Sequence, residues 1–369
     1  MVIALRRLGD VLLTTPLIRT MRRGLPEARI DVLLFAGTEG ILQGNPDIER
    51  TITMPERASL GETLKLMRRI AGRYDLVVST QPGDRPVFLA LVAGRTRVGL
   101  VPDDKRSWWK RWVFHRPVPV RAGDHRIVEV MRLAEALGLA GDAEVVCPAG
   151  GSAEAIAPQM PYAVLHPTPK FRYRHWTDAG WRVLARELSS RGLAVVVTGG
   201  SDAAERTYLD GLWRDLDPPV VRLDGQLDWP GLAALLAGAA VYVGVDTSMT
   251  HLAAASGCPT VALFGPTDPR LWGPWPAGGL DRAWDAAGAI QQRRNVWLVQ
   301  NVLPCTPCQR EGCERHTGSY SACLDDLDVR AVLAAADQAL ASRAAPSAGW
   351  RSTPKADIES AMTPPLVKQ

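Results

Sequence analysis

Residues 241–265, VYVGVDTSMTHLAAASGCPTVALFG, are the stretch of sequence that decides the fold. An apolar, β-branched run from Val241 to Val245 stops abruptly at Asp246-Thr247-Ser248. A helix-like segment follows from Met249 to Ser256, and a second apolar run begins after Pro259. A buried strand that feeds a helix and returns to a buried strand is the repeating unit of a parallel sheet flanked by helices.

The turn from this strand into the helix is also a candidate anion site. The first backbone N–H groups of a helix have no partner within the helix, and the helix dipole adds positive potential there. Together they favour a phosphate or diphosphate. The alternative is an ordinary βαβ unit in which Asp246 or Thr247 only caps the helix.

Length and composition narrow the class of protein. A chain of 369 residues favours two domains over one, and an apolar fraction of 46% suits a globular protein with sizeable cores. The longest uncharged stretches, such as 230–245, are too short and too broken by glycine to span a bilayer. The N-terminal residues MVIALRRLGD do not resemble a secretory signal, so we expect a cytoplasmic chain.

Strand-like and helix-like segments alternate twice along the chain. The expected strands are Val2–Leu5, Ile30–Phe35 and Leu76–Ser79, then Tyr162–His166, Leu193–Thr198, Val241–Val245 and Thr260–Phe264. A helix is expected over Val11–Arg23, kinked at Pro16. The pattern predicts an α/β fold of two doubly wound domains, 1–150 and 161–340, joined through a linker at 147–161 and followed by a disordered tail, 341–369. In such sheets ligands bind at the carboxyl ends of the strands, so both domains should face a central cleft.

Asp10 is the first candidate for chemistry. The first strand is followed by Arg6-Arg7-Leu8-Gly9-Asp10, which has one glycine where a dinucleotide fold would have G-x-G-x-x-G. A nicotinamide or flavin cofactor is therefore not expected. The turn at Gly9 should present Asp10 at a helix N-terminus, either as a capping residue or as a general base facing the cleft.

A basic and tryptophan-rich segment lies between residues 105 and 126. Net charge is only +4, but this segment holds seven cations against one aspartate: Lys105, Arg106, Lys110, Arg111, Arg116, Arg121 and Arg126. Trp108, Trp109 and Trp112 lie among them. Such a patch could contact a phosphorylated glycolipid, a membrane surface or nucleic acid. The alternative is a solvated basic loop whose tryptophans pack inward.

Four of the six cysteines form a cluster in sequence, Cys305, Cys308, Cys313 and Cys323, with His316 among them. In a cytoplasmic protein this spacing suggests a zinc site before disulfides, although it departs from two tight C-x-x-C pairs. Reduced structural thiols are the simpler interpretation.

Several motifs occur together in one order along the chain: RRLGDVLLTTPLI (6–18), HPTPKFRYRHWTDAGW (166–181), TGGSDAAE (198–205) and GVDTSMTHLAAASGCPTVALFGPTD (244–268). In this they resemble the ADP-heptose:lipopolysaccharide heptosyltransferases of glycosyltransferase family 9, over about residues 1–340. Within that family, DVLLFAGTEGILQGNPDI (31–48) and FGPTDPRLWGPW (264–275) are most similar to heptosyltransferase III.

The resemblance implies a glycosyltransferase-B fold and an inverting reaction that needs no cofactor or metal ion. It places the general base on Asp10. The donor, ADP-heptose, would be bound by Thr168, Arg174, Glu205, Asp246, Thr247, Ser248, Met249 and His251. Lys170 and Arg172 are alternatives to Arg174 for the phosphate contact, and Asp202 is the alternative to Glu205. His251 would contact phosphate or orient Asp246.

The resemblance also implies an acceptor, the inner core of lipopolysaccharide. It implies a cytoplasmic chain in peripheral contact with the inner membrane, and no nucleic-acid partner. The candidate acceptor-binding cations are Arg6, Arg7, Lys105, Arg106, Lys110 and Arg111. Three alternatives stay open: a family member acting on another heptose position or surface glycan, a nucleotide-sugar epimerase, and a non-catalytic nucleic-acid-binding or lipid-binding protein.

Overall fold

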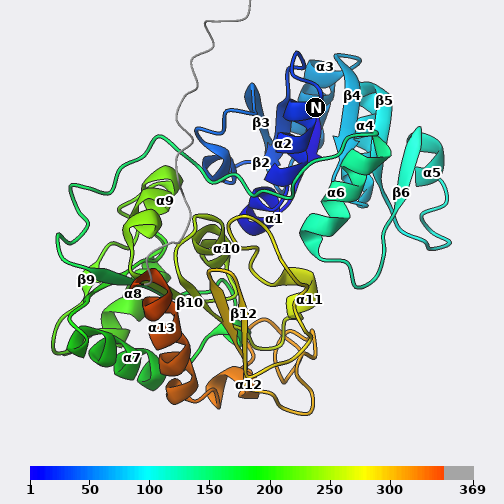
Figure 1. The fold of residues 1–369 in the computed structure, drawn as a ribbon. Coiled ribbons are helices and arrows are strands. Elements are labelled where there is room, and N and C mark those ends of the chain that lie inside the picture. The colour runs from blue at the N-terminus through cyan, green and yellow to red at the C-terminus, as the bar shows by residue number, and fades with distance from the viewer. Residues whose placement is uncertain (345–369) are drawn as a thin grey trace, which may run out of the picture.

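The computed structural model describes residues 1–344, which form two domains that each centre on one twisted sheet (Figure 1). The segment expected as a disordered tail lies outside the described residues, except that 341–344 end the last helix. Residues 137–161, between the two sheets, hold no helix or strand. Among residues 1–344, no helix combines the length and apolar character needed to span a bilayer.

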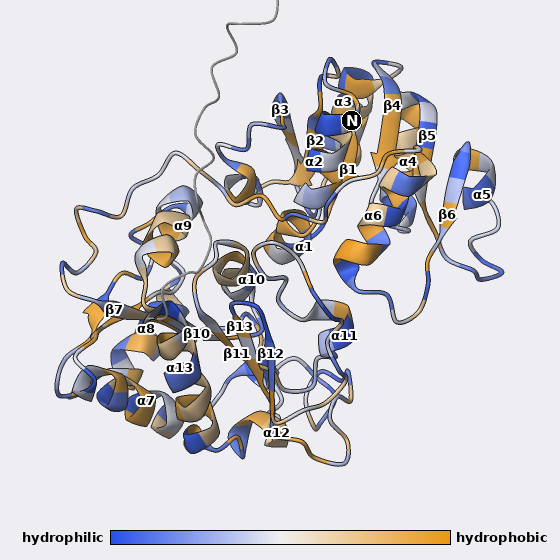
Figure 2. Ribbon diagram, in the orientation of Figure 1, coloured by the Kyte–Doolittle hydropathy of each residue, from blue (hydrophilic) through white to orange (hydrophobic). Residues whose placement is uncertain are grey.

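The first domain holds six parallel strands in the order β3-β2-β1-β4-β5-β6. Their bounds are β1 Val2–Ala4, β2 Asp31–Phe35, β3 Arg50–Met54, β4 Tyr74–Ser79, β5 Gly94–Val101 and β6 Arg116–Pro119. The central strand β1 is apolar and buried along its whole length, and most of β4 is coloured as hydrophobic in Figure 2. Burial on both faces is what a parallel sheet covered by two helical layers requires.

Helices cover the two faces of this sheet separately. On one face, α2 (Thr15–Gly24) and α6 (Arg126–Ala136) pack against the sheet in one apolar cluster. On the other, α3 (Leu60–Ile70), α4 (Asp84–Ala93) and α5 (Lys110–Val113) pack in a second cluster. A single-turn 3₁₀ helix, Glu39–Leu42, follows β2.

The helix expected over Val11–Arg23 is two helices, because Pro16 breaks it rather than kinking it. The first, α1, runs from Leu8 to Leu12, and α2 begins at Thr15 with Pro16 in its first turn. Proline is accepted there because the first N–H groups of a helix have no intrahelical partner. The break separates α1, which carries Asp10, from the longer helix behind it.

The second domain holds seven strands in the order β12-β13-β11-β10-β7-β8-β9. Their bounds are β7 Tyr162–His166, β8 Ala194–Val197, β9 Val221–Arg222, β10 Val241–Val245, β11 Thr260–Leu263, β12 Ile290–Arg293 and β13 Val296–Val299. All neighbours are parallel except β12, which pairs antiparallel with β13. The helices are α7 Asp178–Ser190, α8 Ala203–Leu212, α9 Trp229–Gly238, α10 Ser248–Ala255, α11 Pro269–Trp272, α12 Ala322–Asp325 and α13 Val329–Ala344.

Each sheet reverses its winding direction at one point. In the first domain the reversal lies between β1 and β4, and in the second between β7 and β10. Such switch points open a crevice at the carboxyl ends of the two strands. The loop after β1 leads into α1, and the loop after β10 leads into α10. These two helices lie against one another where the domains meet (Figure 1).

Candidate active site

Asp10 lies in the first turn of α1, immediately beyond the switch point of the first sheet. Its side chain is largely buried, and its Oδ1 has no hydrogen-bond partner within residues 1–344. The helix does not use Asp10 as its cap, because the capping position belongs to Arg7 and no side chain bonds the helix end there. The carboxylate is therefore held at the cleft without a structural role in α1.

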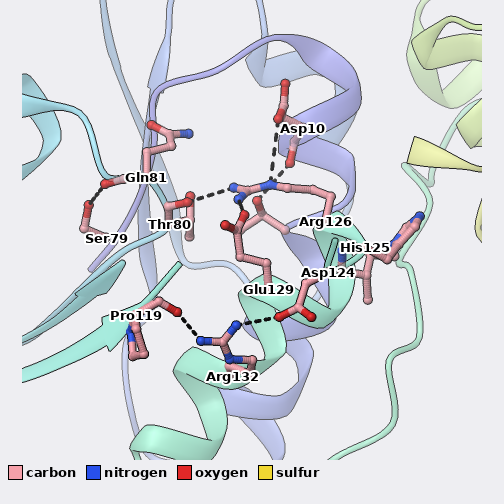
Figure 3. A network of polar contacts seen from close by, with 12 residues as sticks. Asp10, Ser79, Thr80, Gln81, Pro119, Asp124, His125, Arg126, Glu129 and Arg132 are labelled. Atoms are coloured by element: carbon pink, nitrogen blue, oxygen red, sulfur yellow. Dashed lines mark hydrogen bonds and ion pairs between the residues drawn. The ribbon is translucent and has the colours of Figure 1, made fainter. Parts of the chain in front are cut away.

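Arg126, at the start of α6, is the cation closest to this carboxylate. Its Nε lies 3.7 Å from Asp10 Oδ1, and its side chain is buried (Figure 3). The guanidinium also donates to the carbonyl of Thr80, 2.8 Å away, and to the Glu129 carboxylate. Thr80 follows β4, so Arg126 joins the two strand ends of the switch point. The expectation that Arg126 belongs to the exposed basic segment is wrong, because its side chain is turned into the domain.

Asp246, directly after β10, forms the corresponding centre on the second domain. Its Oδ2 accepts a hydrogen bond from Thr267 Oγ1 at 2.7 Å and lies 3.0 Å from Arg174 Nη1. The same Arg174 nitrogen donates to the Asp246 carbonyl at 3.1 Å. Burial alone would lower the pKa of Arg174, but the Asp246 carboxylate, Tyr173 and Asp10 together outweigh it and raise that pKa above its ordinary value. Asp246 thus fixes the position of a fully charged guanidinium.

The N-terminus of α10 faces the first domain. Thr247 occupies its capping position, yet the Thr247 hydroxyl bonds no helix N–H and is without a partner in the described chain. A Cβ atom built on Gly9 would lie 3.7 Å from Ser248 Cα and 3.5 Å from His251 Cδ2. The turn before Asp10 therefore lies within van der Waals reach of the helix that begins at Ser248 and Met249. The alternative in which Asp246 or Thr247 only caps the helix does not hold.

Unpaired buried polar atoms are concentrated at this junction. Six side chains there each have a buried nitrogen or oxygen with no hydrogen-bond partner in residues 1–344: Asp10 Oδ1, Arg126 Nε, Thr168 Oγ1, Arg174 Nε, Thr247 Oγ1 and His251 Nδ1. Buried polar groups in folded proteins are nearly always paired, so unpaired ones need an explanation. These unpaired atoms come from both switch points and lie at one junction. They therefore indicate a binding site for a polar ligand.

His251 lies one turn into α10 and is buried. Burial lowers the pKa of its imidazole, although the nearby Asp246 and Asp10 carboxylates oppose that shift. The structure has no hydrogen bond from His251 to Asp246, which is held instead by Arg174 and Thr267. Of the two roles predicted for His251, this geometry favours a direct contact with a ligand.

The loop after β8 distinguishes Glu205 from Asp202. Asp202 caps α8 by accepting from the N–H groups of Ala204 and Glu205, at 2.9 and 3.3 Å. Glu205 accepts from Gly200 N at 2.7 Å through Oε1 and holds the glycine turn in shape. Asp202 therefore serves the cap of α8 and Glu205 the glycine turn, each through one carboxylate oxygen.

The three candidate phosphate cations differ in their surroundings. Only Arg174 is directed at Asp246, while Lys170 and Arg172 are exposed. Lys170 Nζ lies 5.9 Å from the Phe171 ring centre. Arg7 of the first domain approaches the same ring, its Cζ 4.8 Å from the centre. Arg7 therefore helps to close one edge of the cleft.

The predicted acceptor cations fall into two groups. Arg6 lines a hollow of about 510 Å³ at the ends of β1 and β4, together with Leu5, Gln81, Pro82 and Arg85 among others. Lys105, Arg106 and Arg111 lie around α5, at the far edge of the first domain in Figure 1. Arg111 pairs with Asp103 at 2.7 Å.

Lys110 is buried, contrary to the expectation of a free acceptor cation. Its Nζ lies 2.8 Å from Asp84 Oδ1 and donates to the Pro82 carbonyl at 2.6 Å. Its charge is therefore already compensated within the first domain, and its visible role is to tie α5 to the wall of the hollow.

The cysteine cluster is not assembled as a metal centre. All four thiols are free, with Cys305 and Cys313 exposed and Cys323 buried. Across 1–344, no group of three or more His, Cys, Asp or Glu residues is arranged to hold a metal ion. His316 bonds Glu314 at 3.1 Å rather than approaching the thiols.

Two residues of the site were not singled out from the sequence. Thr267 belongs to the GPTD segment, but nothing in the segment indicates which carboxylate its hydroxyl would bond. Arg126 has one local signal: it follows a histidine that could cap a helix. Only the strand order shows that this helix begins beside Asp10.

The sequence is similar to those of known glycosyltransferases. Residues 63–313 match glycosyltransferase family 9 (heptosyltransferase). The chain is 30% identical over 288 residues to lipopolysaccharide heptosyltransferase 3 of Escherichia coli, covering 72% of this chain and 83% of that protein. It is 32% identical over 321 residues to lipopolysaccharide heptosyltransferase 1 of Pseudomonas aeruginosa, covering 83% and 84%.

The fold is similar to that of solved heptosyltransferases. The structure of E. coli heptosyltransferase WaaC with ADP matches with a TM-score of 0.64 and 22% identity, over 81% of this chain and 92% of that one. The expected fold, two Rossmann-like domains of the glycosyltransferase-B type, is confirmed.

Proposed function

Because this chain belongs to glycosyltransferase family 9, we propose that it transfers heptose from ADP-L-glycero-D-manno-heptose to the inner core of lipopolysaccharide. Its relatives of known name are lipopolysaccharide heptosyltransferases, and one solved neighbour binds ADP. The observation that carries the proposal is the set of unpaired polar atoms where the two switch points meet. Atoms from both domains there would bind one donor and one acceptor.

The chemistry is a single displacement at the anomeric carbon. A hydroxyl oxygen of the acceptor attacks that carbon while Asp10 accepts the hydroxyl proton. The bond from the anomeric carbon to the diphosphate oxygen breaks, and ADP leaves with the electron pair. One displacement inverts the anomeric configuration. Asp10 suits the role of base because its Oδ1 is unpaired at the cleft.

The leaving diphosphate gains negative charge, and this site offers positive groups to stabilise it. Arg174 is held in place by Asp246, and the N-terminus of α10 adds the helix dipole and its first N–H groups. Thr247, Ser248, Met249 and His251 lie on the same helix end, and Thr168 lies across from it beyond β7. These groups can supply the charge stabilisation themselves, so the proposed reaction requires no metal ion. Glu205 would contact the nucleoside.

The acceptor would enter from the first domain. Arg6 and Arg85 both line the hollow at the ends of β1 and β4, and both cations suit the phosphates and carboxylates of an inner-core acceptor. Lys110 shapes this hollow rather than binding the acceptor, for the reason given above.

Turnover of ADP-heptose with a panel of truncated inner-core acceptors tests the proposal. We expect transfer to an acceptor that already carries two heptoses, and a loss of about 10²–10⁴-fold in kcat for Asp10→Ala, the usual contribution of a general base. Binding of ADP should survive in Asp10→Ala, because Asp10 does not belong to the nucleotide site.

The panel also separates the acceptor from the fold and the donor. Transfer only to an acceptor without heptose would move the assignment to a first heptosyltransferase, as the P. aeruginosa relative suggests. Full activity in Asp10→Ala would exclude Asp10 as the base. If the protein binds ADP-heptose but transfers heptose to none of the acceptors, the proposed donor stands and the proposed acceptor is wrong.

A further inference from the structure

The outer side of α3, α4 and the α5 segment exposes an unusual number of large apolar side chains. Leu60 is 91% exposed, Trp112 is 82% exposed and Trp108 is 63% exposed. Leu64, Phe88 and Leu91 are also exposed. Single exposed apolar residues are normal on a protein surface, but a group of them on adjacent elements marks an interaction site.

These residues share one face of the first domain. Leu60 and Leu64 lie one turn apart on α3, and Phe88 and Leu91 lie one turn apart on α4, so each pair points to one side of its helix. Helix α4 packs between α3 and α5. Phe88 stacks on Trp109 with ring centres 5.2 Å apart, which links α4 to the loop carrying Trp108. Because α3, α4 and α5 cover the face of the sheet opposite α2 and α6, this surface is turned away from the helices that flank Asp10.

Positive charge surrounds these apolar residues. Six exposed cations on α3, on α4 and in the segment before α5 have no carboxylate partner within residues 1–344: Lys65, Arg68, Arg69, Arg85, Lys105 and Arg106.

The carboxylates of the same elements are already engaged. Asp84 pairs with Lys110, Asp103 pairs with Arg111, and Glu62 completes the capping box of α3. Asp104 accepts from the backbone N–H groups of Arg106 and Ser107. The surface is therefore both apolar and cationic.

A lipid bilayer with anionic headgroups matches both properties. Tryptophan prefers the boundary between headgroups and acyl chains, leucine and phenylalanine enter the acyl region, and lysine and arginine attract anionic headgroups. Nucleic acid would use the cations, but it offers nothing to exposed leucines. We propose that this surface, defined by Leu60, Leu64, Phe88, Leu91, Trp108 and Trp112 with the cations around them, docks the protein on a bilayer that contains anionic phospholipid.

Flotation of the full chain with vesicles tests this inference. Vesicles of phosphatidylcholine alone are compared with vesicles of phosphatidylcholine and phosphatidylglycerol in equal parts. We expect the protein to float with the anionic vesicles and to bind the neutral ones much more weakly. Bromine-labelled acyl chains should quench part of its tryptophan fluorescence, since two tryptophans enter the bilayer.

Two double variants test the apolar and the charged contributions separately. Trp108→Ser with Trp112→Ser should lower the partition coefficient about tenfold or more and abolish the quenching. Lys65→Gln with Arg68→Gln should lower it about fivefold per cation removed, with a weaker dependence on salt. Matched controls on other surfaces are Met160→Ser with Val302→Ser, each residue 51% exposed, and Arg186→Gln with Arg214→Gln. Circular dichroism confirms that each variant is folded.

Several results would overturn the inference. They are wild-type protein that does not float with anionic vesicles, tryptophan variants that float like their controls, and duplex DNA that binds the same surface more tightly than vesicles. A dimer in sedimentation velocity that Trp108→Ser with Trp112→Ser dissociates would instead make this surface a contact between two copies of the chain. Vesicle binding needs neither donor nor acceptor, so failure of the transfer assay leaves this test unaffected.

Discussion

At the scale of single residues, Arg126 is the group that controls the surroundings of Asp10. Its guanidinium is buried and divided among Asp10, Glu129 and the Thr80 carbonyl (Figure 3). A planar guanidinium holds several acceptors in one fixed plane, whereas the three N–H donors of a lysine rotate freely and fix no such plane. We therefore interpret Arg126 as a positioning residue that holds the Asp10 carboxylate toward the acceptor.

The first prediction is that Arg126→Gln lowers kcat about a hundredfold with little change in the KM for ADP-heptose, because a small misplacement of a reacting group has effects of that size. In an Asp10→Ala background the same substitution should cost almost nothing more, since the two residues act as a unit. Kinetics of the four proteins in this cycle give the result.

Arg132→Gln is the matched control for that cycle. Arg132 lies on the same helix, is also buried, and pairs with Asp124 at 2.5 Å, away from Asp10. It should lose stability without losing kcat. If the losses in kcat from the Asp10 and Arg126 substitutions simply multiply in the double variant, Arg126 does not act by positioning Asp10. Its effect on kcat is then a general effect on the fold.

At the scale of elements, two helices that both follow a threonine differ in what the threonine does. Thr177 caps α7, because its hydroxyl accepts from Gly180 N at 3.1 Å. Thr247 precedes α10 in the same position, and its hydroxyl bonds nothing in the described chain. One threonine stabilises its helix, and the other leaves its hydroxyl to a ligand.

The same substitution at the two sites should therefore have opposite effects. Thr177→Val should lower the free energy of unfolding by about 1 kcal/mol and leave transfer intact. Thr247→Val should leave stability within about 0.5 kcal/mol and weaken ADP binding roughly tenfold, the cost of one hydrogen bond to a charged group. Urea unfolding and calorimetric titration with ADP measure the two quantities. Loss of stability at Thr247 with unchanged ADP affinity would contradict the assignment.

The sequence predicts most of the strands that are uninterrupted apolar runs and misses strands whose apolar run is interrupted or very short. The strands at 162–166 and 241–245 are confirmed, since burial on both faces needs apolar side chains throughout. Strand β5 is missed because Arg95, Thr96 and Arg97 interrupt the apolar pattern in its first half. Strand β13 is missed although its four residues are all apolar, because so short a run does not distinguish a strand from a buried helical segment. Strand β12, its antiparallel partner, carries Gln291, Gln292 and Arg293 and gives no apolar signal.

The candidate site divides in the same way. Asp10 and Asp246 are predictable, because each follows an apolar strand at a point where a helix begins. The position of Arg126 is not predictable, because it lies near Asp10 only if β1 and β4 are neighbours in the sheet. These two strands are far apart in the sequence. Lys110 shows the opposite error. A lysine in a basic segment suggests an exposed charge, but the fold buries the Lys110 side chain and pairs it with the exposed carboxylate of Asp84.

At the scale of the whole molecule, His125 joins the two domains. It caps α6 by accepting from Ile127 N at 3.2 Å through Nδ1, so the neutral ring carries its proton on Nε2. Nε2 then donates to the Gly273 carbonyl of the second domain at 2.9 Å. The ring also packs against Trp275, whose Nε1 donates to the Ala143 carbonyl of the first domain at 2.7 Å. The neutral ring can therefore make both hydrogen bonds. A protonated ring would carry a hydrogen on Nδ1 and could no longer accept from Ile127 N.

Burial lowers the pKa of His125 from 6.5 to about 4, although the Gly273 carbonyl opposes the shift. Above pH 6.5 the ring is neutral in both the folded and the unfolded chain, so it adds no pH dependence. Between pH 6.5 and 4 the unfolded chain binds a proton that the folded chain refuses, and the free energy of unfolding falls as the pH is lowered.

His125→Asn should remove this contribution while keeping a good helix cap. The loss of stability between pH 6.5 and 4 should become shallower by up to about 1.4 kcal/mol per pH unit, the linkage value for one group. Urea unfolding at a series of pH values measures the slope. Thr177→Val is the control, because it changes the cap of another helix and no titratable group, and its slope should match the wild type. An unchanged slope in His125→Asn would mean that the ring is protonated in the folded protein, and the link from α6 to Gly273 would then have to tolerate a charge between the domains.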